Sequence, residues 1–141
     1  MKILALDLGD KWVGSAISDP LGITCKPLKT VELDNLKPFL KDTLSTQPIS
    51  IVVVGYPKTF SGTESDQTKK IVKLKEELEL EFSNVNFTDI KWILWDERLS
   101  SKRALEIQSG KYDPESKRQN HSLAAAFILQ NYLDHLAFNK N

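Results

Sequence analysis

The sequence has a single cysteine, Cys25, among 141 residues. One thiol cannot form a disulfide within the chain, and a zinc site made of several thiolates is excluded for the same reason. Nothing in the cysteine usage ties the fold to an oxidising compartment. We therefore expect a cytoplasmic protein whose fold is held together by its hydrophobic core.

An excess of charge of either sign is also missing. The 19 lysine and arginine side chains are balanced by 19 aspartates and glutamates, so the formal net charge is zero. This excludes a histone-like or polybasic binder, because overall electrostatics would not hold such a chain on a polyanion. Contact with nucleic acid has to come from a local patch. The most basic segment is 98–120, in which six cations accompany three acids.

Long apolar runs, repeats and low-complexity tracts are absent as well. The first apolar run, residues 3–6, is too short for the hydrophobic region of a signal peptide or for a membrane span. No interdomain linker stands out, and the length suits one domain with a sizeable core. We predict a single domain over 1–141 and no membrane partner.

Apolar patterning predicts both strands and helices. Short apolar runs predict strands at 3–8, 12–18, 23–31, 49–54 and 91–95. Apolar residues at helical spacing predict helices at 33–44, from the end of a 58–63 loop to Phe82, at 100–108 and at 122–136. The last helix is expected to carry Leu123, Phe127, Leu133 and Leu136 on one side, and the polar segment 110–119 is expected to be a loop.

The order of these elements is β-β-β-α-β-α-β-α. Three strands joined by short turns imply antiparallel pairing, and the later alternation of helix and strand implies parallel pairing. We therefore predict an α/β fold with a five-stranded mixed sheet and helices on both faces. Gly9 and Gly14, beside the first hairpin, leave room for a helix or a substrate backbone to approach.

Polar residues follow the first and last predicted strands. Asp7 ends the first strand, Asp96 and Glu97 end the last, and Asn120 and His121 stand where the last helix begins. If these strands lie near each other, the side chains converge on one edge of the sheet, where α/β folds bind ligands. Two or three oxygen ligands would suit Mg²⁺ or Mn²⁺. Taken singly, each residue also has an ordinary explanation as a turn former, a surface ion pair or a helix cap.

Several linked motifs give the chain a more specific resemblance. It resembles the YqgF family of pre-16S rRNA nucleases, which are relatives of the RuvC-type Holliday-junction resolvases. The resemblance runs in the same order over nearly the whole chain, from residue 7 to residue 133. The motifs are Asp7-x-Gly9-x-Lys11-x-Val13-Gly14, Val54-Gly55-x-Pro57, Ser61-Gly62, Asp96-Glu97-Arg98-Leu99-Ser100 and Ala124-Ala125-x-x-Ile128-Leu129-Gln130-x-Tyr132-Leu133.

The resemblance implies an RNase H-like fold and a set of catalytic, metal-binding residues. Asp7 would be the first metal carboxylate and Glu97 the second, with Asp96 as the fallback. The family's third acid is replaced by His121. A neutral imidazole is a competent ligand that suits Mn²⁺ better than Mg²⁺, and the positive end of a helix would favour the neutral ring. Trp12 stands where the family usually has arginine; it could stack on a base, but we expect it to be packed.

Several cations near this edge are candidates for nucleic-acid binding. They could hold a phosphate backbone without reading sequence, although surface charges and ion pairs are equally ordinary explanations. The candidate residues are Lys11, Arg98, Lys111, Lys117 and Arg118.

The function predicted from the resemblance is metal-dependent hydrolysis of an RNA phosphodiester. The substrate would be the 5′ region of pre-16S rRNA, free or in a ribosomal particle, and the protein would be a monomer or a homodimer. Cleavage of a DNA junction is the first alternative and would need a dimer. The second is a non-catalytic ribosome-assembly factor. An ATP-binding fold of the actin and sugar-kinase type is disfavoured, because it needs two such domains.

Overall fold

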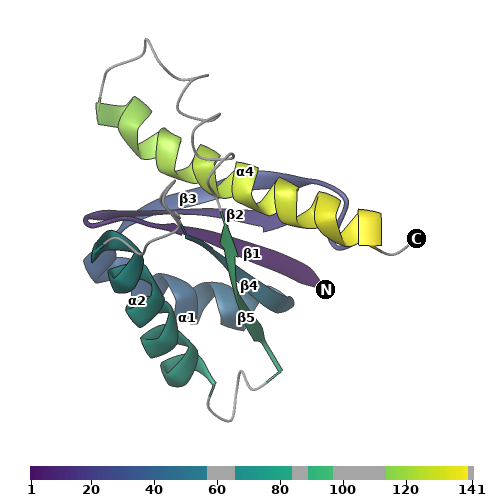
Figure 1. Ribbon diagram of the computed structural model, residues 1–141, viewed down its shortest axis with the longest axis horizontal. Helices are drawn as coiled ribbons and strands as arrows, with labels where there is room; N and C mark the ends of the chain where they lie inside the picture. Colours follow the sequence, from purple (N-terminus) through teal and green to yellow (C-terminus); the bar gives the residue numbers. More distant parts are fainter. Residues whose placement is uncertain (57–65, 84–88, 97–113, 140–141) are drawn as a thin grey trace.

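The computed structural model describes residues 1–56, 66–83, 89–96 and 114–139. All five strands belong to one sheet of order β3-β2-β1-β4-β5 (Figure 1). The first two pairings, β1–β2 and β2–β3, are antiparallel, and β1–β4 and β4–β5 are parallel. The elements are β1 (Lys2–Leu8), β2 (Trp12–Ser18), β3 (Cys25–Glu32), the 3-10 turn η1 (Leu33–Asn35), α1 (Leu36–Thr46), β4 (Ile49–Tyr56), α2 (Asp66–Phe82), β5 (Lys91–Asp96) and α4 (Pro114–Asn139).

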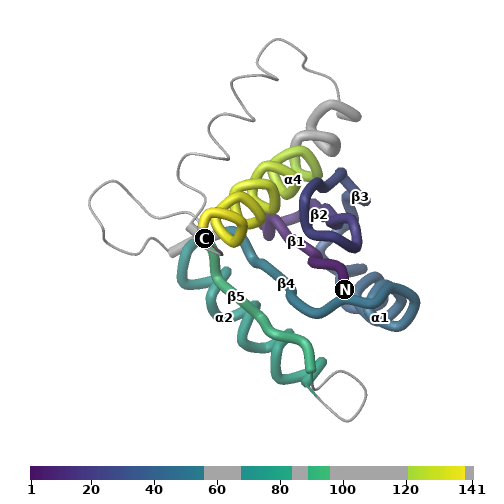
Figure 2. The backbone as a smooth tube through the Cα atoms, turned by 90° about the vertical axis from the view of Figure 1, so that its right-hand side faces the viewer, coloured from purple at the N-terminus to yellow at the C-terminus, as the bar shows by residue number. Residues whose placement is uncertain are grey.

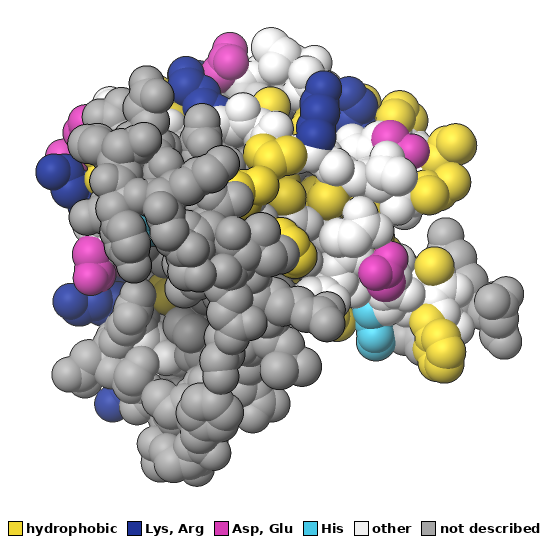
Figure 3. Space-filling model, turned by 90° about the horizontal axis from the view of Figure 1, so that it is seen from above, with side chains coloured by type: hydrophobic (Ala, Val, Ile, Leu, Met, Phe, Trp, Pro, Cys, Tyr) yellow, Lys and Arg dark blue, Asp and Glu magenta, His cyan; other side chains and the backbone are white. Residues whose placement is uncertain are grey.

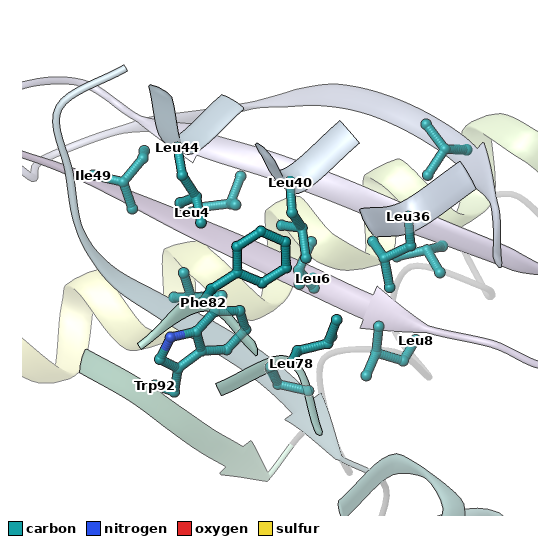
Figure 4. Close-up of a cluster of buried hydrophobic side chains, with 14 of the residues drawn as sticks. Leu4, Leu6, Leu8, Leu36, Leu40, Leu44, Ile49, Leu78, Phe82 and Trp92 are labelled. Carbon is teal, nitrogen blue, oxygen red and sulfur yellow. The ribbon is translucent and has the colours of Figure 1, made fainter. Parts of the chain in front are cut away.

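The sheet is covered on both faces, as Figure 2 shows with α4 on one side and α1 and α2 on the other. Alternate residues of each strand point to opposite faces, so the central strands read as continuous apolar runs. The core under α1 and α2 is built from large side chains, many of which are labelled in Figure 4. Its fully buried members include Leu4, Leu6, Leu40, Leu78 and Val52. The predicted mixed sheet with helices on both faces is confirmed.

The core under α4 contains smaller side chains. Ala5 of β1 and Ala16 of β2 pair across the strands and face Ala125 of the helix, and all three are fully buried. Small residues on both surfaces let a helix backbone approach a sheet closely, so less side-chain volume separates the two layers. Ile128 and Leu129 complete this contact further along the helix. The alanines therefore set how closely α4 lies on the sheet.

The predicted start of the last helix is wrong. The helix begins at Pro114, so residues 114–119 are helical rather than a loop. Proline favours the first turn of a helix, and a polar segment needs no apolar face to extend a helix that is already packed. Of the four apolar residues expected on one side of the helix, Leu133 is buried, whereas Leu123, Phe127 and Leu136 are half-buried. The helix also contacts the sheet through small residues, among them Ala125.

The predicted helix at 100–108 and the predicted loop at 58–63 lie outside the described residues. Across the part of the chain that is described, no helix is both long and apolar enough to cross a membrane.

Candidate functional site

A single row of residues crosses the sheet at the end of β1. Strand register aligns Thr30 of β3 with Gly14 of β2, Gly14 with Asp7 of β1, Asp7 with Gly55 of β4, and Gly55 with Trp95 of β5. Residues in register on neighbouring strands point to the same face, and this face carries α4. We call these five residues the Asp7 row. Because a glycine stands on each side, no neighbouring strand places a side chain beside the Asp7 carboxylate.

His121 of α4 lies against that carboxylate. Its Nδ1 is 3.5 Å from Oδ2 of Asp7, and the two side chains are 34% and 16% exposed. Its Cε1 lies 3.4 Å from the point that a Cβ on Gly9 would occupy. The site is therefore partly covered yet open to solvent, as a site for an external ligand has to be. The sequence-based expectation that the first strand and the last helix bring Asp7 and His121 together is met by this geometry.

Gly14 allows the helix to come this close. A Cβ on Gly14 would lie 2.0 Å from the carbonyl oxygen of His121 and 2.6 Å from the backbone nitrogen of Ser122. These are backbone atoms that cannot turn aside, so no other residue fits without moving α4. The sequence predicted that these glycines leave room for either a helix or a substrate backbone. At Gly14 the helix takes that room.

A partly buried hydrogen bond joins α4 to the far end of the Asp7 row. The hydroxyls of Ser122 and Thr30 share this bond, with 2.5 Å between Oγ and Oγ1. Ser122 is 7% exposed. Successive helix residues point about 100° apart, so Ser122 reaches β3 while His121 reaches β1. The helix is thus seated over Gly14 and held on both sides.

The hairpin after Asp7 carries the one basic candidate whose side chain is described. The turn is closed by a hydrogen bond from the Gly9 nitrogen to the Trp12 carbonyl at 3.0 Å. Lys11 is exposed, and its Nζ lies 5.9 Å from the centre of the Trp12 indole. Trp12 is half-buried, so the expectation that it is packed is met in part.

The other basic candidates are not placed as side chains. Lys117 and Arg118 fall in the helical turns of α4 that precede His121, although their side chains lie outside the description. Arg98 and Lys111 lie outside the described residues altogether.

The second carboxylate is also beyond the described part. Glu97 lies outside the described residues, and Asp96 ends β5 with its side chain undescribed. Within the described residues, no group of three or more His, Cys, Asp or Glu side chains gathers in a way that could hold a metal ion. The described donor set is therefore the pair formed by Asp7 and His121.

That pair fits a divalent cation in its chemistry. Neighbouring ligands on an octahedral ion, each at roughly 2.1 Å, lie about 3 Å apart. The observed separation of 3.5 Å is close to this value. One oxygen and one nitrogen donor suit Mn²⁺ better than Mg²⁺.

The expectation that His121 begins the last helix is wrong, because α4 begins at Pro114. The argument that the helix dipole favours a neutral His121 ring therefore no longer applies.

Comparisons with known proteins decide the family. A family model described as "RuvX: Holliday junction resolvase" matches residues 1–135. The chain belongs to the RuvX family. A Clostridium tetani protein named "Putative pre-16S rRNA nuclease" is 38% identical to this RuvX chain over 143 residues, which cover 95% of the chain and 96% of that protein. The resemblance drawn from the motifs is confirmed.

Two solved structures share the fold of this RuvX protein. T. thermophilus RuvC in complex with a Holliday junction substrate has a TM-score of 0.60 at 14% identity, covering 97% of this chain and 96% of that one. The fowlpox virus resolvase with its substrate Holliday junction DNA has a TM-score of 0.60 at 15% identity, covering 96% and 99%. At such identities the likeness shows the fold alone, which is RNase H-like. Membership of RuvX confirms the expectation of a nuclease, a hydrolase of phosphodiester bonds.

Sequence reasoning missed part of this site. Thr30 and Ser122 carry no motif that singles them out, and only strand register reveals that Thr30 shares a row with Asp7. The glycines did give a signal, because two of them flank the first hairpin beside a strand-ending aspartate.

Proposed function

We propose that this RuvX chain is a divalent-metal-dependent endonuclease that hydrolyses RNA phosphodiester bonds and matures the 5′ end of pre-16S rRNA, a role that belongs in the cytoplasm. The observation that carries the proposal is the Asp7 carboxylate 3.5 Å from the His121 imidazole, in a row that is otherwise free of acids. The pre-16S rRNA nuclease named above, alike over almost its full length, favours RNA as the substrate.

The residues proposed to hold Mg²⁺ or Mn²⁺ are Asp7, Glu97 and His121. Strand alternation supports Glu97 over Asp96. Ile93 and Trp95 join the core under α4, whereas Trp92 and Leu94 join the core on the opposite face. Continued alternation would give position 97 the same face as Asp7. Within the Asp7 row, Gly55 of β4 places no side chain between Asp7 and β5.

The bound cation would supply Lewis-acid stabilisation of the phosphate and activation of the attacking water. The chain's own residues would do the rest. The glycines beside Asp7 would let a substrate backbone approach the carboxylate, and the exposed Lys11 would meet a phosphate next to it. Lys117 and Arg118, with Arg98 and Lys111, would extend this contact along the strand without reading its sequence.

Cleavage of a labelled single-stranded RNA spanning a 16S precursor end tests the proposal. Wild type should cut in Mn²⁺ or Mg²⁺ and not in EDTA. Asp7→Asn and Glu97→Gln should lose at least about 100-fold of the rate, because each removes a charged ligand without changing its shape. The matched control is Asp10→Asn, which neutralises an exposed carboxylate of the same hairpin and should cut like wild type.

A second candidate function is cleavage of a four-way DNA junction. It is favoured by the family description and by the two structural relatives that hold Holliday junctions. The same variants should be assayed on a labelled junction beside the RNA. Faster cutting of the junction, by a dimer, would replace RNA with DNA as the substrate. Absence of cutting on either substrate by folded wild type would favour a non-catalytic assembly factor.

A further inference from the structure

We propose that Thr30 and Ser122 are positioning residues that fix the His121 imidazole against Asp7. The inference rests on the proposed function, because it concerns how the same metal site is kept in shape. Neither residue touches the two donor atoms by any described contact. They would act through the rotation of α4 about its own axis.

The argument begins with what Gly14 does and does not determine. The close approach at Gly14 sets how near the backbone of residues 121 and 122 comes to the sheet. Because a glycine has no side chain, this contact does not by itself prevent α4 from rotating about its own axis. The apolar contacts further along α4 are non-directional. The described hydrogen bonds there, from Cys25 to the Ala126 carbonyl at 3.2 Å and from Gln130 to the Ile23 carbonyl at 3.3 Å, lie more than one helical turn from His121. A directional contact beside Gly14 would fix the rotation at His121 itself.

The Ser122–Thr30 hydrogen bond is such a contact. The two hydroxyl oxygens lie 2.5 Å apart, and Ser122 is 7% exposed, so water competes little for the Ser122 hydroxyl. Thr30 lies in register with Gly14, which is in register with Asp7. The bond therefore lies in the same row as Asp7. It holds α4 to β3, one strand away from Gly14, over which the helix backbone lies.

The geometry makes small rotations matter. Side-chain ends lie about 5–6 Å from a helix axis, so a roll of about 10° moves the imidazole by about 1 Å. A displacement of that size at a catalytic centre can cost about 100-fold in rate. The hydrogen bond at Ser122 opposes the roll that would draw His121 away from Asp7.

A purely structural role is the competing explanation, and the chain offers a matched control for it. The Ser15 hydroxyl is fully buried and joins β2 to β3, accepting from the Lys29 nitrogen at 3.1 Å and donating to the Lys29 carbonyl at 2.5 Å. Its strand neighbour Ala16 faces α4, so Ser15 points to the other face. Ser15→Ala should lower stability without disturbing His121.

The experiment compares Thr30→Val, which keeps the shape and loses the hydroxyl, with Thr30→Ser, which keeps the hydroxyl. The first readout needs no metal and is the NMR cross-relaxation between the proton on His121 Cε1 and the Cα protons of Gly9. We expect it in wild type, because His121 Cε1 lies 3.4 Å from the point that a Cβ on Gly9 would occupy. The second is Mn²⁺ affinity, measured from the electron paramagnetic resonance signal of the free ion. Thermal midpoints report stability in all variants.

Thr30→Val should weaken the cross-relaxation and lower Mn²⁺ affinity about 10-fold, the lower end of the effect of removing a group that orients a metal ligand. Thr30→Ser and Ser15→Ala should keep both readouts. Wild-type values of either readout in Thr30→Val would overturn the proposal. If Thr30→Val does not fold, Ser122→Ala takes its place with the same expected losses. If wild type binds Mn²⁺ but cuts no substrate, the proposed function fails while these comparisons still decide the positioning role.

Discussion

At the scale of single residues, the proposal gives the imidazole of His121 the role of setting the metal preference of the site. Replacing it with a carboxylate in His121→Asp would give Mg²⁺ the oxygen ligand that it prefers. We expect the ratio of the cleavage rate in Mg²⁺ to the rate in Mn²⁺ to rise about 10-fold, in keeping with the usual effect of altering a metal's ligand shell. The ratio is measured on the RNA substrate at saturating metal.

The control for this change is His135→Asp, the same substitution at an exposed position of the same helix. It should leave the metal ratio as in wild type. An unchanged ratio in His121→Asp itself would show that position 121 does not contact the metal.

Cys25 illustrates a residue whose environment suppresses its chemistry. Its Sγ donates to the Ala126 carbonyl at 3.2 Å. Burial, followed by the charges of Asp134 and Asp19, raises the pKa of the Cys25 thiol from 9.0 to about 11. At pH 8 the folded protein should react with iodoacetamide about 100-fold more slowly than the urea-unfolded chain, because the thiolate is the nucleophile. Equal rates would contradict the protected thiol.

The same pKa shift has a consequence for stability at high pH. The unfolded thiol ionises near 9.0, whereas the folded one keeps its proton until about 11. The folded state therefore binds more protons in this window, and the free energy of unfolding should fall as the pH rises through it. Below pH 8 the group should have no effect. A Cys25→Ser variant should lose this part of the alkaline decline, and an identical pH profile would contradict the assignment.

At the scale of elements, the proposed site depends on the contact between α4 and β2, where the helix backbone lies directly against Gly14. Gly14→Ala should destabilise the fold by about 3 kcal/mol, at the upper end of overpacking effects, because the Cβ meets helix backbone. It should also abolish cleavage by moving His121. Urea unfolding and the RNA assay measure the two effects.

Gly22 provides the comparison for that substitution. It has a φ of 71°, and a Cβ there would meet only Leu133 Cδ2 at 4.0 Å. Gly22→Ala should cost about 1 kcal/mol from the left-handed backbone and leave cleavage intact. Full stability of Gly14→Ala would show that α4 can be displaced without cost.

Elements with a strong apolar pattern were predicted well from the sequence. The strand at 12–18 was predicted with the bounds that β2 has, and β1 and β5 each differ by one residue at one end. The start of α4 was missed because its first turns are polar and carry no apolar period. The whole Asp7 row could not be foreseen, because only its Asp7–Gly14 pair belongs to a local hairpin, whereas the pairs with Gly55 and Trp95 join segments far apart in the sequence.

At the scale of the whole molecule, the sheet order places β1 in the centre, between β2 and β4. Asp7 therefore lies where the two halves of the sheet meet. Its neighbour on one side is the antiparallel strand β2, and its neighbour on the other side is the parallel strand β4. Figure 3, which views the α4 face, shows cations and acids interspersed over the described surface rather than gathered by sign. With a net charge of zero, binding of nucleic acid has to rely on a few local cations.

The most direct test of the account is to locate bound Mn²⁺ by anomalous X-ray scattering from crystals soaked in the metal. The account predicts a peak within about 2.3 Å of both Oδ2 of Asp7 and Nδ1 of His121, the usual range for such ligands. Crystals of Asp7→Asn should lose the peak, and those of Asp10→Asn should keep it. A well-occupied Mn²⁺ bound elsewhere, with none between these two atoms, would contradict the central claim that Asp7 and His121 form the metal site.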